Sequence, residues 1–242
     1  MTRPHPVTLL PVALVTVAGL VGACSSTGSD ATPSTPDTTT SQSSAPPTTH
    51  SSDEPIDIMQ IPEDTPLEPG KYSVGLLSDD GPTRAIVDVP EGYVAGGPVI
   101  HSDDGSIAFR GKVTKVDTDP CLGGKHIGAG TSVHDLAAKL LAQRHIMTSQ
   151  PEPVTIGGYH GVHLTLTAPA DLDRCRGGSV TILTAGGTWL QSDVPNTTFH
   201  EWILNVRGTR VVGGAMISPD AANPAELIHM VESAKFTRAD QP

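Results

Sequence analysis

The stretch from Ser25 to Pro55 sets the limits of what this chain can fold into, because it consists mainly of Ser, Thr and Pro. It has no aromatic residue and almost no aliphatic one, so it cannot bury enough apolar surface to offset the entropy of ordering its backbone. We predict that residues 24–55 form a disordered linker, with a root-mean-square reach on the order of 30 Å. A folded domain must therefore come from residues 56–242, which suffice for one core and do not require two domains.

The segment ahead of the linker is typical of a secretion signal. Arg3 is the only charged residue among the first 29, and an apolar run follows from Val7 to Gly22. That run is too short to span a membrane as a helix, which takes about 20 apolar residues. We therefore expect residues 1–23 to be a signal peptide that is removed on export.

The four residues Val21-Gly22-Ala23-Cys24 resemble the lipobox of bacterial lipoproteins. The resemblance implies transfer of diacylglycerol to the Cys24 thiol, cleavage before Cys24 and often acylation of the new amino group. Each buried CH2 group contributes about 0.8 kcal/mol, so two or three acyl chains would hold the protein firmly. We expect a lipid anchor on the extracytoplasmic face of the cell membrane. The alternative is an ordinary secreted protein with an incidental cysteine.

Charge excludes some partners for residues 56–242. This part of the chain carries 14 Lys or Arg against 22 Asp or Glu, and the charges are dispersed. Because no basic patch occurs, nucleic acid and anionic lipid headgroups are poor candidates for binding. Acidity of this size mainly keeps a protein surface soluble.

Two cysteines remain in the domain, Cys121 and Cys175. In an exported chain they are expected to form a disulfide, which would close a loop of about 55 residues and stabilise the fold by roughly 4 kcal/mol in the chain-entropy model. A metal-binding or catalytic thiol is the alternative. It is disfavoured because neither cysteine belongs to a C-x-x-C pair or to the local pattern of a known thiol protease.

Most of the domain has the sequence pattern of β-strands. Between Gly161 and Thr167, Val162, Leu164 and Leu166 alternate with polar residues, which is typical of a strand with one buried face. Similar short runs, separated by turn residues, recur from residue 71 to residue 217. We predict an antiparallel sheet of about six to eight strands.

Two segments have helical periodicity instead. From Val133 to Leu141 the apolar residues form one stripe, and Ser132 with Asp135 resembles a capping pair. Near the C-terminus, Asn223 is a strong N-cap candidate and Glu226 would complete a capping box. The fold class is therefore predicted to be α+β, with the sheet packed against two amphipathic helices.

Three stretches carry a family resemblance: Val87–Tyr93, Val154–Val162 and Val231–Phe236. They look similar to recurring segments of actinobacterial (mycobacterial-type) exported lipoproteins of unknown function, some of which resemble Mog1/PsbP-like α+β domains. The resemblance covers most of residues 71–236 and rests on structural motifs. It implies no catalytic residue. Tyr93 stands where the family commonly has Trp.

A glycine-rich loop, Gly123–Gly130, leads into the first predicted helix. Free backbone N–H groups at such a place can bind an anion, and Lys125 and His126 would add positive charge. Gly124, Lys125, His126 and Gly128 are therefore candidate ligand-binding residues. The loop lacks the Gly-Lys-Ser/Thr ending of a P-loop, so a flexible connection held at Cys121 is the competing interpretation.

Histidine is abundant, but its spacing does not indicate a metal site. His134 and His145 are expected on one helix face about 16 Å apart, too far to share an ion. His160 and His163, three apart on a strand, point to opposite faces. No H-E-x-x-H or G-x-S-x-G motif occurs. We predict no catalytic residue, no metal and no cofactor.

These observations favour a non-catalytic binding or interaction module rather than an enzyme. Its partner would be an envelope protein or an apolar envelope ligand, in addition to the membrane that holds the lipid on Cys24. Two alternatives stay open: an envelope enzyme with an unrecognised site, and a purely structural envelope component.

Overall fold

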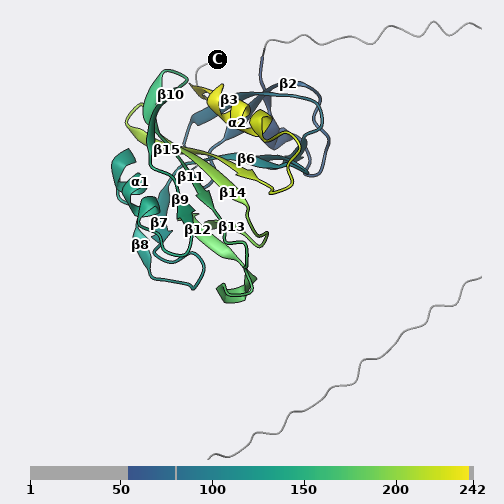
Figure 1. Cartoon of the computed structure of the whole chain (residues 1–242). Coiled ribbons are helices and arrows are strands. Elements are labelled where there is room, and N and C mark those ends of the chain that lie inside the picture. Colours follow the sequence, from purple (N-terminus) through teal and green to yellow (C-terminus); the bar gives the residue numbers. More distant parts are fainter. Residues whose placement is uncertain (1–53, 80, 240–242) are drawn as a thin grey trace, which may run out of the picture. The chain divides into compact units, whose positions relative to one another are not determined.

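The computed structural model describes residues 54–79 and 81–239 (Figure 1). The predicted signal peptide, Cys24 and nearly all of the predicted linker lie outside these residues. The described residues form three β-sheets and two α-helices, so the predicted α+β class is confirmed. No helix among them is long and apolar enough to cross a membrane.

The largest sheet, here called the central sheet, has eight strands. Seven of them pair in the order β10 (Glu152–Ile156), β11 (Tyr159–Thr167), β14 (Thr198–Val206), β15 (Thr209–Ile217), β6 (Gly105–Arg110), β5 (Val99–Ser102) and β4 (Val94–Gly96). The eighth, β9 (Met147–Thr148), pairs with the end of β11. Every pairing in this sheet is antiparallel.

Two four-stranded sheets flank it. The first consists of β1 (Ile56–Asp57), β2 (Gly70–Gly75), β3 (Thr83–Val89) and β16 (Lys235–Arg238). The second consists of β13 (Thr188–Ser192), β12 (Val180–Ala185), β7 (Val113–Asp117) and β8 (His126–Gly128). The sequence analysis predicted a single sheet. Strand periodicity does not reveal which distant strands pair, so it could not show the division into three sheets.

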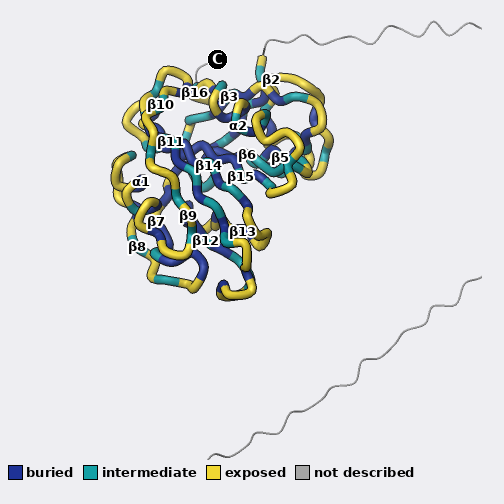
Figure 2. Tube along the Cα trace, viewed as in Figure 1, coloured by how far each residue is buried: buried dark blue, intermediate teal, exposed yellow. Residues whose placement is uncertain are grey.

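Alternating residues of the central strands supply two separate cores. On β14, Trp202 and Leu204 belong to one core, and Phe199 and Ile203 belong to the other. The sheet therefore buries both faces, as the dark interior of Figure 2 shows. We call the two cores the α2-side core and the α1-side core, after the helix that packs in each.

The α2-side core lies between the central sheet, the sheet of β2 and helix α2 (Pro224–Glu232). Helix α2 buries Leu227, Met230 and Val231 in it. Two edge-to-face ring pairs, Phe109–Phe236 and Tyr159–Phe236, each with centroids 5.9 Å apart, lie at its β16 end. Such pairs add about 0.5–1.5 kcal/mol beyond their buried area.

The α1-side core lies between the central sheet, the sheet of β12 and helix α1 (Val133–Leu141). It contains a buried ion pair between Arg110 Nη1 and Glu201 Oε2, 3.6 Å apart. Burial raises the pKa of Glu201 to about 7, although the charge of Arg110 opposes this. Gly214 lies on β15 between them, and a Cβ there would come 2.3 Å from Arg110 Nη1. The pair therefore depends on glycine at this position.

The two helices begin differently. At α1 the predicted capping pair is confirmed: the Ser132 hydroxyl accepts from the Asp135 N–H, and the Asp135 carboxylate accepts from the Ser132 N–H. At α2 the predicted capping box is wrong. The Asn223 side chain donates to the Glu226 carboxylate instead of capping the helix. The Asp104 carboxylate accepts from the N–H of Asn223 and of the residue before it.

Two of the three stretches that carry the family resemblance meet in space. Gly157, in the turn between β10 and β11, has φ +57°, and a Cβ there would come 2.9 Å from the Ala234 carbonyl oxygen. Tyr159 follows this turn and packs against Phe236. These motifs therefore shape the α2-side core rather than a polar site.

Candidate functional site

The Cys121–Cys175 disulfide, predicted from the sequence, is present. It joins the loop after β7 to the loop after β11 across 54 residues of sequence, with the Cα atoms 4.4 Å apart. Backbone hydrogen bonds reinforce the junction, because the Arg176 N–H donates to the Cys121 carbonyl and the Thr181 N–H donates to the Pro120 carbonyl. The two loops are thus held to each other and to β12.

A hollow of about 420 Å³, which we call the disulfide hollow, opens beside this bridge. Its lining includes Cys121 and the glycines of the adjoining loops. Its lining also carries Asp117 and His126 from β7 and β8, Arg176 from the second loop, and Trp189 and Gln191 from β13. The hollow therefore combines one large aromatic ring with several hydrogen-bonding groups, as ligand sites commonly do.

Asp117 and His126 form a polar pair in the lining of the hollow. They face each other in the β7–β8 ladder, and Asp117 Oδ1 lies 2.9 Å from His126 Nδ1. The Asp117 side chain is only 5% exposed, whereas that of His126 is 54% exposed. Burial raises the pKa of Asp117, while the nearby His126 opposes the shift. A buried carboxylate thus orients an exposed imidazole, and Nε2 is the ring nitrogen left for a ligand.

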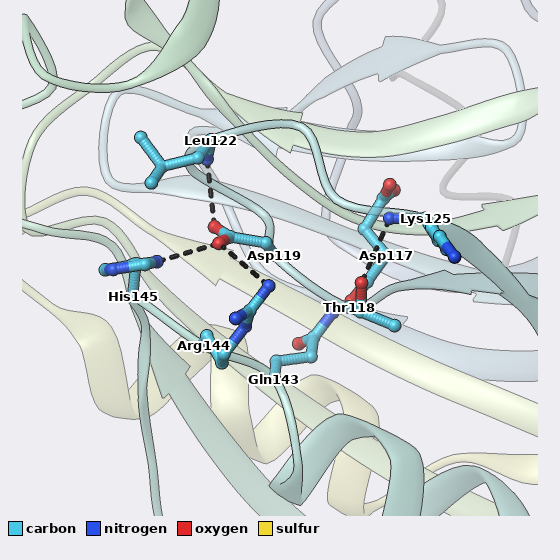
Figure 3. Close-up of polar contacts among 8 residues, drawn as sticks. All are labelled: Asp117, Thr118, Asp119, Leu122, Lys125, Gln143, Arg144 and His145. Carbon is cyan, nitrogen blue, oxygen red and sulfur yellow. Dashed lines mark hydrogen bonds and ion pairs between the residues drawn. The ribbon is translucent and has the colours of Figure 1, made fainter.

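A second carboxylate, Asp119, fixes the loop behind the hollow (Figure 3). It accepts a hydrogen bond from the Leu122 N–H at 2.9 Å, lies 2.9 Å from His145 Nδ1 and forms an ion pair with Arg144 at 3.6 Å. Burial by itself would raise the pKa of Asp119, but these hydrogen bonds and positive neighbours outweigh it and lower the pKa. The loop is consequently tied to the segment after α1.

His145 contradicts one sequence expectation. Helix α1 ends at Leu141, and His145 has a positive φ of 58°, so His145 does not share a helix face with His134. The change of backbone direction brings the His145 ring to Asp119 instead. Helical periodicity could not reveal this, because the contact forms only after the helix has ended.

The glycine-rich loop uses its backbone N–H groups internally. The N–H groups of Gly123 and Gly124 both donate to the Asp119 carbonyl, and the Lys125 N–H donates to the Thr118 hydroxyl. Gly124 is required for this packing, because a Cβ there would come 2.6 Å from the Asp119 nitrogen. These three groups are therefore not free to hold an anion, which favours the interpretation of the loop as a structural connection.

Of the four predicted ligand-binding residues, Gly124 and His126 line the disulfide hollow. Lys125 and Gly128 belong to the same segment but do not line it. Gly128 pairs with Lys115 at the end of the β7–β8 ladder. The binding role predicted for these four residues stays a prediction, and the polar groups that line the hollow come mainly from side chains rather than from free backbone N–H groups.

Trp189 is the residue that sequence reasoning missed. It lies on β13 with 60% of its surface exposed, although Trp is usually well buried. The signal was available, because Leu190 alternates with Trp189 and Gln191, and a buried Leu190 places its two neighbours on the outer face.

A separate aromatic cluster lies at the β11–β14 edge of the α2-side core. His163 Nε2 and His200 Nδ1 are 3.1 Å apart, and both rings stack on buried Trp202. Burial lowers the pKa of His163, and burial together with the charge of His163 lowers that of His200 to about 4. Among the described residues, no group of three or more His, Cys, Asp or Glu side chains is placed to hold a metal ion.

Comparison with known proteins gives no family for the chain. No family model matches it, and no curated protein matches it. Its function must therefore be argued from its own residues.

Proposed function

We propose that this protein is a lipid-anchored extracytoplasmic binding module whose ligand site is the disulfide hollow. One observation carries the proposal: the hollow is preorganised. The Cys121–Cys175 bridge joins its loops, buried Asp117 orients exposed His126, and Asp119 fixes the loop behind them. Preorganised groups lose little conformational freedom on binding, so a rigid hollow of this kind is suited to recognition.

The composition of the hollow favours a polar partner over an apolar one. Arg176, Gln191 and His126 line the hollow together with a single exposed ring, whereas an apolar ligand would leave these groups without hydrogen bonds. The two apolar cores lie on the faces of the central sheet and are filled by buried side chains. Of the partners expected from the sequence, an envelope component with polar groups is thus better supported than an apolar molecule.

The anchor explains where such a module would act. The lipobox-like sequence before Cys24 supports a location outside the cytoplasm, where disulfides such as Cys121–Cys175 form and persist. A linker of about 30 residues with a reach of roughly 30 Å would let the hollow search a thin layer next to the membrane. Weak binding suffices in this layer, because tethering raises the effective concentration of the domain near its ligand.

The anchor is tested by metabolic labelling with an alkyne fatty acid in a lipoprotein-processing bacterial host. The wild-type chain should incorporate the label and sediment with membranes. The Cys24→Ser variant should lose the label and become soluble, because no thiol remains for acyl transfer. Labelling that persists in Cys24→Ser, or a wild-type chain without label, would contradict a lipid on Cys24.

The hollow is tested by sedimentation of the unlipidated Cys24→Ser chain with delipidated cell envelopes of its host. We expect retention that falls about tenfold, equivalent to about 1.4 kcal/mol, when His126→Gln or Trp189→Ala is added. Met147→Ala is the matched control, because Met147 is also a large exposed apolar residue and lies on β9, away from the hollow. Equal retention of all four chains, or of none, would refute a binding site at the hollow.

A further inference from the structure

The Trp189 indole provides a flat apolar surface in the lining of the disulfide hollow. It lies on β13, an edge strand of its sheet, and 60% of its surface is exposed. Exposing so much of an indole forgoes a large part of the stabilisation that burial of a large apolar side chain provides. An exposed ring in a hollow that also carries polar side chains therefore indicates a ligand with one apolar face.

The polar side chains that line the hollow supply an amide, a guanidinium group and two hydroxyls. Gln191 is two residues from Trp189 on the same face of β13, and Thr181 pairs with Gln191 in the β12–β13 ladder. Ser179 and Arg176 approach from the second disulfide loop. Amide and guanidinium groups each offer paired hydrogen-bonding positions, which match ligands with neighbouring hydroxyl groups.

Two glycines shape the disulfide loops on this side of the hollow. A Cβ at Gly123 would come 3.1 Å from Arg176 Cδ, so glycine there lets the arginine side chain lie close over the loop. At Gly177, which also lines the hollow, the position of a Cβ is open. A ring-shaped ligand can therefore approach the backbone on this side.

The charge of the hollow does not suit an anionic ligand. Buried Asp117 opposes the charge of Arg176, and the nearby N–H groups of Gly123 and Gly124 donate to the Asp119 carbonyl. A phosphate or carboxylate would meet one arginine and His126, whose ring already pairs with the buried Asp117 carboxylate, without N–H donors from Gly123 and Gly124. The remaining fit is a neutral molecule with many hydroxyl groups.

We infer that the disulfide hollow binds a neutral saccharide, with one sugar face stacked on Trp189 and its hydroxyls bonded to the Gln191, Arg176 and His126 side chains. The C–H face of a pyranose is apolar and matches the indole, and its equatorial hydroxyls match the hydrogen-bonding side chains that line the same hollow. This inference rests on the proposed function, because it names the ligand class of the same hollow.

The two tryptophans of the chain make the test direct. Trp202 is fully buried and Trp189 is exposed, so a saccharide that covers Trp189 should shift the fluorescence and reduce quenching by acrylamide. The probe is the neutral oligosaccharide fraction released from the host's own delipidated, deproteinised envelope. It is titrated into the full Cys24→Ser chain beside the anionic oligosaccharide fraction and the peptide fraction.

We expect a saturable response to the neutral fraction alone. Calorimetry of the same titration should show binding that is lost in Trp189→Ala and about tenfold weaker in Gln191→Ala, while Met147→Ala binds like the unmodified chain. Circular dichroism and an intact disulfide would show that each variant is folded.

The outcomes separate the two proposals. If envelope retention depends on the hollow but only the peptide or anionic fraction competes, the saccharide inference is wrong and the binding module stands. If a neutral saccharide binds equally well to Trp189→Ala, the location is wrong. If neither retention nor any fraction responds to the hollow variants, both proposals fail.

Discussion

The two cores of this domain are held together by different means. The α2-side core combines aliphatic side chains with the edge-to-face rings of Phe109, Phe236 and Tyr159. The α1-side core adds the Arg110–Glu201 ion pair and the Cys121–Cys175 bridge to its apolar contacts. One sheet therefore separates a core that relies on apolar packing from one that is also cross-linked.

The α1 side of the central sheet also contains side-chain hydrogen bonds to carbonyls that are distant in sequence. The Gln143 side-chain amide donates to the Asp117 and Ile182 carbonyls at 2.8 Å each, and Arg210 donates to the Val113 and Gly130 carbonyls. Apolar packing is non-directional, whereas such bonds fix the relative positions of loops and strands. The disulfide hollow opens on this side of the sheet. The loops that line it have little regular secondary structure, so their positions depend on such directional contacts.

The largest effect is expected from breaking the ion pair of the α1-side core. Arg110→Met should lower the free energy of unfolding by about 3–5 kcal/mol, because Glu201 then remains buried without a positive partner. The double variant Arg110→Met/Glu201→Leu should recover most of this loss, since it removes both buried charges. Urea denaturation at pH 9, above the pKa of about 7 that Glu201 has beside Arg110, measures all three chains with the carboxyl ionised in the wild type.

The matched control removes an exposed ion pair on the other side of the sheet. Lys71 and Asp88 lie on β2 and β3 with both side chains well exposed, so Lys71→Met should cost at most about 1 kcal/mol. If Arg110→Met costs no more than Lys71→Met, or if the double variant is as unstable as the single one, the buried pair does not have the assigned role.

Removal of the disulfide should come next in size. The double variant Cys121→Ser/Cys175→Ser is expected to lose about 2–4 kcal/mol, mainly because the unfolded chain gains freedom. Hydrogen exchange followed by mass spectrometry should show faster exchange in the loops around residues 121 and 175 and little change in α2. Equal acceleration on both sides of the central sheet would show that the bridge stabilises the whole domain and not the α1 side in particular.

Periodicity in the sequence was sufficient for the separate elements. The alternation of Val162, Leu164 and Leu166 gave β11, and the stripe after Ser132 gave α1 with its capping pair. The disulfide followed from there being two cysteines in a domain that the sequence predicts to be exported. Each of these features depends on local pattern or on counting, so no knowledge of distant contacts was needed.

Features that depend on distant contacts were not predictable. The capping box at α2 fails because Asp104, more than a hundred residues away in sequence, accepts from the backbone N–H of Asn223. The division into three sheets depends on pairings such as β3 with β16, which join the two ends of the domain. Likewise, Asp117 and Trp189 line the same hollow only because β12 pairs with both β7 and β13.

The smallest effect concerns pH and contrasts neighbours on opposite faces of β14. The pKa of His200 is lowered to about 4, so between pH 6.5 and 4 the unfolded chain binds more protons and stability is lost as pH falls. The pKa of Glu201 is raised to about 7, so its contribution is lost as pH rises from 4.5 towards 7. In the wild-type chain the two trends partly cancel.

His200→Gln should remove one of these trends and expose the other. On going from pH 7 to pH 5, the free energy of unfolding of the variant should rise by about 1–2 kcal/mol relative to that of the wild type. This figure is reduced from the full shift because His200 is partly exposed to solvent. His163, with Glu152 and Glu232 near it, remains and leaves some of the acid-dependent loss. Urea denaturation at several pH values measures the profile, and His160→Gln, at an exposed histidine on β11, is the control. If the free energy of unfolding changes with pH in the same way for wild type and His200→Gln, His200 does not contribute to the acid sensitivity of the α2 side of the sheet.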